Sequence, residues 1–156
     1  MPTAKAPSMR DSAGLPVPLE AAADALCRAS AEAVRQHERV VKLNDRGAHF
    51  SEMQEATALC ELAHQHLRAR CELYEASAAA GKGHHDDAFW HAANALWQAA
   101  RDYSRRHAAG DHASAKLAKH SPEKLGELAM DYELEASAVL SLRNAIAAYR
   151  KLRPDA

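Results

Sequence analysis

The sequence predicts an all-α fold, a single-domain antiparallel four-helix bundle with up-down-up-down helix order. Only eight residues are β-branched, although strands favour β-branched and aromatic side chains. Alanine, the best helix former, makes up about a quarter of the chain. At 156 residues the chain fits one domain, and its core needs neither a disulfide nor a metal in order to fold.

The charge and the cysteine content favour a cytoplasmic protein. The net charge is −1, so no overall field attracts nucleic acid or anionic lipid. Cys27, Cys60 and Cys71 form no C-x-x-C motif, and we expect reduced, mostly buried thiols. We find no secretory signal and no run of about 20 apolar residues that could span a bilayer. We therefore expect a bacterial, cytoplasmic protein with no nucleic-acid partner and no membrane partner.

The first helix follows an irregular N-terminal segment. Residues 1–16 mix proline, serine, glycine and charge without periodicity, so we expect a mobile tail. Pro18 suits the first turn of a helix. Apolar and small residues then recur at spacings of three and four as far as the turn signal at Gly47. These signals predict a helix over residues 18–42, the first element of a bundle that spans residues 17–153.

The second and third helices have clear boundary signals. The second is predicted over residues 52–80, because Ser51 and Gln54 have the spacing of a capping box and Gly81 follows the last periodic residue. The third is predicted over residues 87–109. Acidic residues at its start suit the positive end of the helix dipole.

The fourth helix is predicted over residues 122–152. Gly110 is expected to close the preceding helix. Ser121, Pro122 and Glu123 then supply an N-cap, a first-turn proline and an early acidic residue. Because the links between the helices are short, consecutive helices should run in opposite directions.

Metal binding is the first chemistry that the ten histidines suggest. Glu61 and His64 form one Glu-x-x-His motif, whereas a ferritin-like two-metal site requires that motif on two helices. Pairing positions across the predicted turns places His64 level with Ser30, Arg101 and Ala129, away from other histidines. The main expectation is therefore that no cofactor is bound. The alternative is a ferritin-like bundle in which Glu61 and His64 are ligands of Fe, Mn or Zn.

Acidic residues suggest a second alternative. Glu72 and Glu75 are three positions apart, and Glu127, Asp131 and Glu135 follow one another at intervals of four. These spacings resemble the all-α nucleotide pyrophosphohydrolases of the MazG type, which bind Mg²⁺ through a Glu-x-x-Glu and a Glu-x-x-Asp pair. The resemblance covers the spacings alone, and it implies a Mg²⁺-dependent hydrolase that uses these acids.

Two further sets of residues lie on or beside the apolar stripes. Glu135 is on the apolar stripe of the fourth helix. Pairing positions across the predicted turns places it beside Arg70 of the second helix, so we expect a partly buried Arg70–Glu135 ion pair that fixes the register of the helices. The alternative is a general acid or base in a cleft.

Trp90 and Trp97 are seven positions apart, one position off the apolar stripe of the third helix. They either widen the core or form an interface with another subunit.

These patterns contain no set of residues that predicts a catalytic site. No Ser/His/Asp or Cys/His arrangement converges when positions are paired across the turns. We therefore expect a non-enzymatic protein-interaction or structural module that acts as a homo-oligomer, with Trp90 and Trp97 at the interface. The sequence names no other protein partner.

Overall fold

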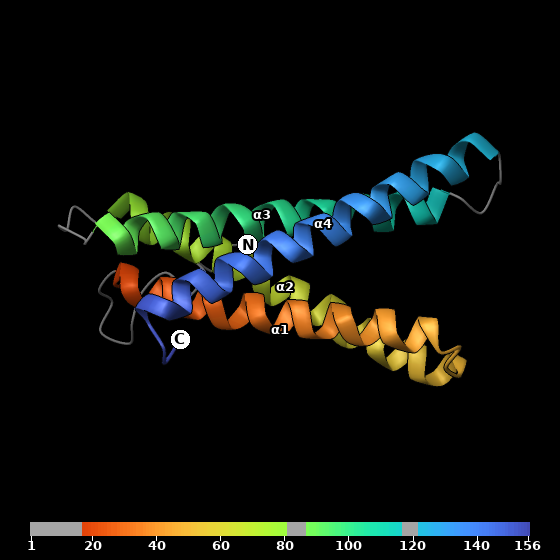
Figure 1. The fold of residues 1–156 in the computed structure, drawn as a ribbon, viewed down its shortest axis with the longest axis horizontal. Coiled ribbons are helices and arrows are strands. Elements are labelled where there is room, and N and C mark those ends of the chain that lie inside the picture. Colours follow the sequence, from red (N-terminus) through yellow and green to blue (C-terminus); the bar gives the residue numbers. More distant parts are fainter. Residues whose placement is uncertain (1–16, 81–86, 117–121) are drawn as a thin grey trace, which may run out of the picture.

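The computed structural model describes residues 17–80, 87–116 and 122–156, and all secondary structure in these ranges is helical (Figure 1). The helices are α1 (Leu19–Asp45), α2 (Phe50–Ala80), α3 (Asp87–Lys116) and α4 (Pro122–Leu152). An all-α chain with four helices is thereby confirmed for the described residues. The predicted tail, residues 1–16, lies outside them. None of the described helices has an 18-residue stretch apolar enough to cross a membrane.

Four helix ends differ from the predicted ones, the smallest difference being that α1 begins at Leu19 and not at Pro18. α1 continues to Asp45, and the turn that follows contains Gly47 in the left-handed region, at a φ of 66°. α2 begins earlier, at Phe50. α3 passes through Gly110 and ends at Lys116, about two turns beyond the predicted end. Glycine inside a helix costs only about 1 kcal/mol relative to alanine, and the surrounding alanine-rich segment favours continuation.

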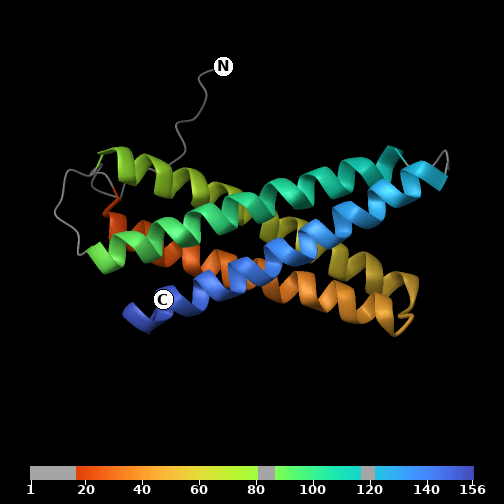
Figure 2. The same cartoon turned by 45° about the horizontal axis from the view of Figure 1, so that its top comes forward.

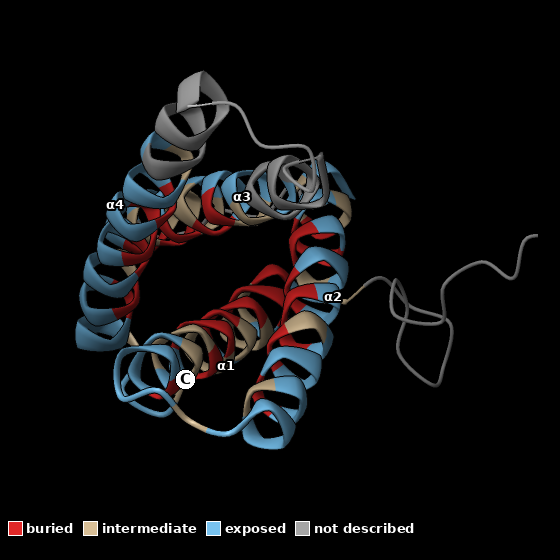
Figure 3. Cartoon of the chain, turned by 90° about the vertical axis from the view of Figure 1, so that its right-hand side faces the viewer, coloured by how far each residue is buried: buried red, intermediate tan, exposed pale blue. Residues whose placement is uncertain are grey.

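The chain runs back and forth along the long axis of the molecule (Figures 1 and 2). α1 packs extensively along α2, and α3 packs extensively along α4. Smaller contacts join α1 to α4, α2 to α3 and α1 to α3. Viewed along the long axis, the four helices surround a common interior toward which the buried residues face (Figure 3). The two helix pairs diverge toward the end that carries the turn at Gly47 (Figures 1 and 2).

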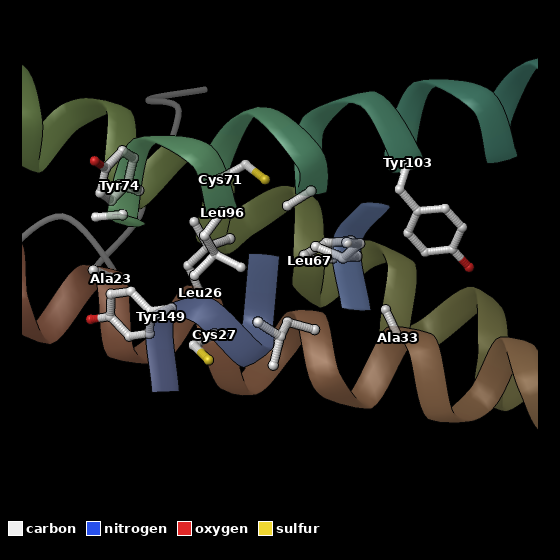
Figure 4. Packing of buried hydrophobic residues seen from close by; sticks show 14 of the residues in the cluster. Ala23, Leu26, Cys27, Ala33, Leu67, Cys71, Tyr74, Leu96, Tyr103 and Tyr149 are labelled. Atoms are coloured by element: carbon white, nitrogen blue, oxygen red, sulfur yellow. The ribbon is translucent and has the colours of Figure 1, made fainter. Parts of the chain in front are cut away.

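The apolar core occupies the part of the molecule where the two pairs lie together (Figure 4). Alanines that are fully buried on facing helices let the backbones approach closely. The largest fully buried apolar or aromatic side chains are Leu26, Leu67, Tyr74, Leu96, Tyr103, Leu142 and Tyr149. Burying each such leucine contributes about 1.5–3 kcal/mol, so these residues provide the main apolar stabilisation.

A polar clamp ties the end of α4 to the start of α1. Arg153 donates from Nε and Nη2 to the two carboxylate oxygens of Asp24, each at 2.7 Å, and the Tyr149 hydroxyl donates to Oδ1 at 2.6 Å. The hydrogen bond from Arg153 is the main reason that the pKa of Asp24 lies below its usual value, because it outweighs the effect of burial. Burial raises the pKa of Tyr149, so its hydroxyl remains a donor at neutral pH.

Replacing Asp24 with asparagine tests this clamp. We expect the free energy of unfolding near neutral pH to fall by about 2 kcal/mol, as is typical for hydrogen bonds to charged groups. Because the pKa of Asp24 is lower in the folded state, its contribution is complete above about pH 4 and is lost as the pH falls through the folded-state value. Urea unfolding at neutral and acidic pH should therefore show a smaller acid loss in Asp24→Asn than in the parent protein. An equal acid loss in both would contradict the clamp, and Glu72→Gln, at an exposed position of α2, serves as the control.

Candidate functional site: a histidine–carboxylate cluster

Polar side chains from all four helices meet at one end of the apolar core. Three of them are almost completely buried: His64 is 1% exposed, Tyr103 0% and Glu135 6%. We call the whole set the histidine–carboxylate cluster. Its members are His37 of α1, Glu61 and His64 of α2, Tyr103 and His107 of α3, and Glu135 of α4.

His107 is the centre of the cluster. Its Nε2 lies 2.6 Å from Oε1 of Glu61, and its Nδ1 lies 2.8 Å from Oε1 of Glu135. An ionised carboxylate can only accept hydrogen bonds, so each ring nitrogen that faces one carries a proton. His107 is therefore an imidazolium whose two N–H groups join α3 to both α2 and α4.

Glu135 is a buried acid that its histidine partners keep ionised. Burial raises the pKa of Glu135, but hydrogen bonds from His107 and His37 outweigh that effect and bring the pKa to about 2. Nδ1 of His37 lies 3.5 Å from the carboxylate oxygen that His107 also contacts. Two histidines from α1 and α3 thus compensate a charge on α4 that would otherwise be costly to bury.

His64 is neutral, and one of its ring nitrogens has no partner in the described part of the chain. Its ring stacks on that of His107, with centroids 3.6 Å apart and an interplanar angle of 5°. Burial, followed by the charge of His107, lowers the pKa of His64 to about 3. Nε2 lies 2.9 Å from the Tyr103 hydroxyl, whereas Nδ1 has no hydrogen-bond partner among the described residues.

The proton of His64 can be assigned from these contacts. A buried N–H without an acceptor is rarer in proteins than a buried acceptor without a donor. We therefore place the proton on Nε2, which donates it to the Tyr103 oxygen. Nδ1 then holds an unused lone pair inside the protein.

The greater length of α3 explains why the predicted position of α4 along the other helices is wrong. Because α3 extends to Lys116, about two helical turns beyond its predicted end, residues of α4 lie beside later residues of α3 than predicted. Glu135 consequently lies beside His107 and Glu61 instead of Arg70. His64 contacts Tyr103, two positions from the predicted neighbour Arg101.

The structure replaces the partner predicted for Glu135. Arg70 lies in a groove between α1 and α2, together with Arg28, Glu32 and His66. Within the described part of the chain it forms no ion pair with Glu135, which is paired with His107 and His37. Glu135 links α4 to α3 and α1 through the imidazole groups of His107 and His37.

Trp90 and Trp97 are half-buried and pack against the core. The indole Nε1 of Trp97 donates to Glu75 at 3.1 Å, and the guanidinium of Arg101 lies 5.3 Å from the Trp97 ring. Trp97 is thus contacted by Glu75 and Arg101 of its own chain. A subunit interface at Trp90 and Trp97 stays a prediction.

The acids of the predicted magnesium site are dispersed. Glu72 is exposed, Glu75 accepts from Trp97, and Glu135 belongs to the histidine–carboxylate cluster. The side chain of Glu127 lies outside the described residues. Among the side chains that are described, no group of three or more His, Cys, Asp or Glu residues is arranged so that it could hold a metal ion.

Comparisons of the chain with known protein families, with curated proteins and with solved structures found no match. The cluster therefore has to be interpreted from its own chemistry. Sequence reasoning identified Glu61, His64 and Glu135 but missed His37 and His107 as their partners. A signal was present, because both histidines occupy apolar stripes of their helices, where an unsatisfied polar group would be costly.

Replacing Glu135 with glutamine tests its role as the buried counter-charge. We expect the free energy of unfolding to fall by about 3 kcal/mol near neutral pH, because His107 keeps a buried charge with one carboxylate fewer. Urea denaturation measures the loss. Glu133→Gln, two positions away at an exposed site, should change stability by less than about 0.5 kcal/mol. Similar losses in the two variants would show that Glu135 is not such a counter-charge.

Proposed function

We propose that this protein is a single-domain antiparallel four-helix bundle that binds one divalent transition-metal ion at the histidine–carboxylate cluster. The observation that carries the proposal is the free, buried Nδ1 of His64 beside the paired His107 ring. Imidazole nitrogens and carboxylate oxygens together suit zinc and iron, and carboxylates also suit manganese. This function develops the alternative that Glu61 and His64 suggest in the sequence.

The surroundings of His64 favour an ion over an organic substrate. The side chain is almost completely buried, so only a small species can reach its Nδ1. Glu61 and Glu135 supply two negative charges that would balance a divalent ion. The present hydrogen-bonded arrangement is the proton-bound form of the cluster, and a metal ion would compete with the protons of His107 for the same nitrogen and oxygen atoms.

The number of motifs supports one ion. Glu61 and His64 supply a Glu-x-x-His pair from α2, and the remaining histidines and Glu135 come singly from the other three helices. A ferritin-like two-metal centre would use a second such pair and a further glutamate. The donor set contains more imidazole than carboxylate, which favours zinc or iron and makes Zn²⁺ a suitable probe.

Zinc titration of the untagged protein tests the proposal. The background for every variant is His84→Ala/His85→Ala, because adjacent histidines can bind zinc adventitiously. Native mass spectrometry and calorimetry should show one Zn²⁺ per chain. Glu61→Ala and His64→Ala should each weaken binding at least about tenfold, since each removes a direct ligand.

His91→Ala is the matched control, because His91 is an exposed histidine on α3 away from the cluster. Its zinc affinity should equal that of the background protein. Absence of stoichiometric Zn²⁺, Fe²⁺ and Mn²⁺, or equal losses in His91→Ala and His64→Ala, would contradict the proposal.

A second candidate function is the non-enzymatic interaction module that acts as a homo-oligomer. The observation that favours it is a set of large apolar side chains that α4 leaves 38–63% exposed, namely Met130, Tyr132, Leu134, Leu140 and Leu152. A helix that is apolar outside its core-facing stripe commonly packs against a further partner. The two candidate functions are compatible, because the outer surface of α4 and the buried cluster use different faces.

A further inference from the structure

α4 carries an exposed stripe on the side opposite the core. The core-facing positions of α4 include Glu135, Leu142 and Tyr149, and its exposed residues face away from the other helices (Figure 3). We call the opposite positions, which are all exposed, the outer α4 stripe. They are Glu133, Ser137, Leu140, Asn144, Ala147 and Lys151.

The spacing of the outer α4 stripe is that of a helix-pairing seam. Its positions alternate at intervals of four and three, the pattern with which two helices interlock side chains. Leu140 is 57% exposed and is the one large apolar residue of the stripe. Ser137 and Ala147 on either side of it are small, which permits close approach of a second helix.

The charges beside the outer α4 stripe are paired within the chain. Nη1 of Arg143 lies 3.1 Å from Oε1 of Glu38 on α1. Nε of Arg150 donates to the carbonyl oxygen of Ala156 at 2.9 Å. These two arginines therefore lie beside the outer α4 stripe, and each already has a partner within its own chain.

The two ends of the outer α4 stripe carry opposite charges. Lys151 lies 18 positions after Glu133, which is about 27 Å along a helix. If two copies of α4 pack antiparallel, Glu133 of each copy lies near Lys151 of the other, and Leu140 lies near Asn144. A parallel arrangement would instead bring like charges together at both ends, so the charge pattern selects the antiparallel one.

We infer that the outer α4 stripe is the interface of a homodimer, in which a second copy of this chain packs its α4 antiparallel about a two-fold axis between Leu140 and Asn144. A self-complementary surface of this kind is what a two-fold interface requires. The inference goes beyond metal binding and gives the second candidate function a defined surface. One pair of helices buries less area than a standard stable interface, so we expect a dissociation constant in the micromolar range.

Sedimentation equilibrium of the full chain, with and without charge reversal, tests the dimer. Glu133→Lys and Lys151→Glu should each weaken dimerisation at least about tenfold, because each places like charges together twice in a two-fold dimer. Combining the two reversals in one chain should restore dimerisation. Leu140→Asp should weaken it as well, and Glu72→Lys on the exposed side of α2 is the control that should leave it unchanged.

Disulfide cross-linking tests the orientation of the two helices. A mixture of Leu140→Cys and Asn144→Cys chains should form the mixed disulfide faster than either chain forms a disulfide with itself. The natural cysteines Cys27, Cys60 and Cys71 are buried and should not compete. Faster self-linking of Leu140→Cys would overturn the antiparallel register.

Two results would overturn the dimer itself. One is a monomer throughout the micromolar range. The other is an oligomer that the α4 variants leave intact and that Trp97→Ala dissociates, which would place the interface on the face predicted from Trp90 and Trp97. Zinc binding at the buried cluster is measured separately, so failure of the dimer is distinguishable from failure of the metal site.

Discussion

The hydrogen bonds of the His107 imidazolium fix how the two helix pairs lie against each other. The ring belongs to α3, and its two nitrogens contact carboxylates on α2 and α4. Contacts within each pair are extensive, whereas those between the pairs are smaller, and the buried apolar cluster as a whole includes many alanines. Alanine surfaces resemble one another from turn to turn, so apolar packing alone would discriminate weakly between alignments. Directional bonds to a charged ring admit one alignment, because a shift of one turn would leave three charges unpaired.

The same cluster shows how a small protein tolerates charge beside its core. Glu135 is ionised and buried, and it is compensated by histidines of α1 and α3. His64 remains neutral because burial, and then the positive charge of the stacked His107, lower its pKa. The neutral ring keeps a free lone pair as a result. The feature that makes the cluster a candidate metal site therefore follows from the charge balance of the whole network.

The fold was largely predictable, and the site was predictable in part. Scarcity of β-branched residues, helix caps and periodic apolar stripes act locally, so they identify four helices and place every helix end except that of α3 within three residues. Glu61, His64 and Glu135 were also identifiable, because each falls in a motif or on a stripe. Their partners depend on the end of α3, where the stop signal of Gly110 was outweighed by its alanine-rich surroundings. The predicted end of α3 was wrong by two turns, which is about 11 Å at the helical rise. For this reason Arg70 was predicted as the neighbour of Glu135, whereas the observed neighbour is His107.

The unequal contacts within and between the helix pairs also determine how the chain can fold. α1 and α2 are joined by a short turn at Gly47, so docking them closes a short loop and costs little chain entropy. Contacts between residues close in sequence are associated with fast folding of helical proteins. Clamping Arg153 to Asp24, in contrast, closes a loop of almost the entire chain. The helix pairs are therefore expected to form before they dock, and the buried charges would lose their water only in that late step.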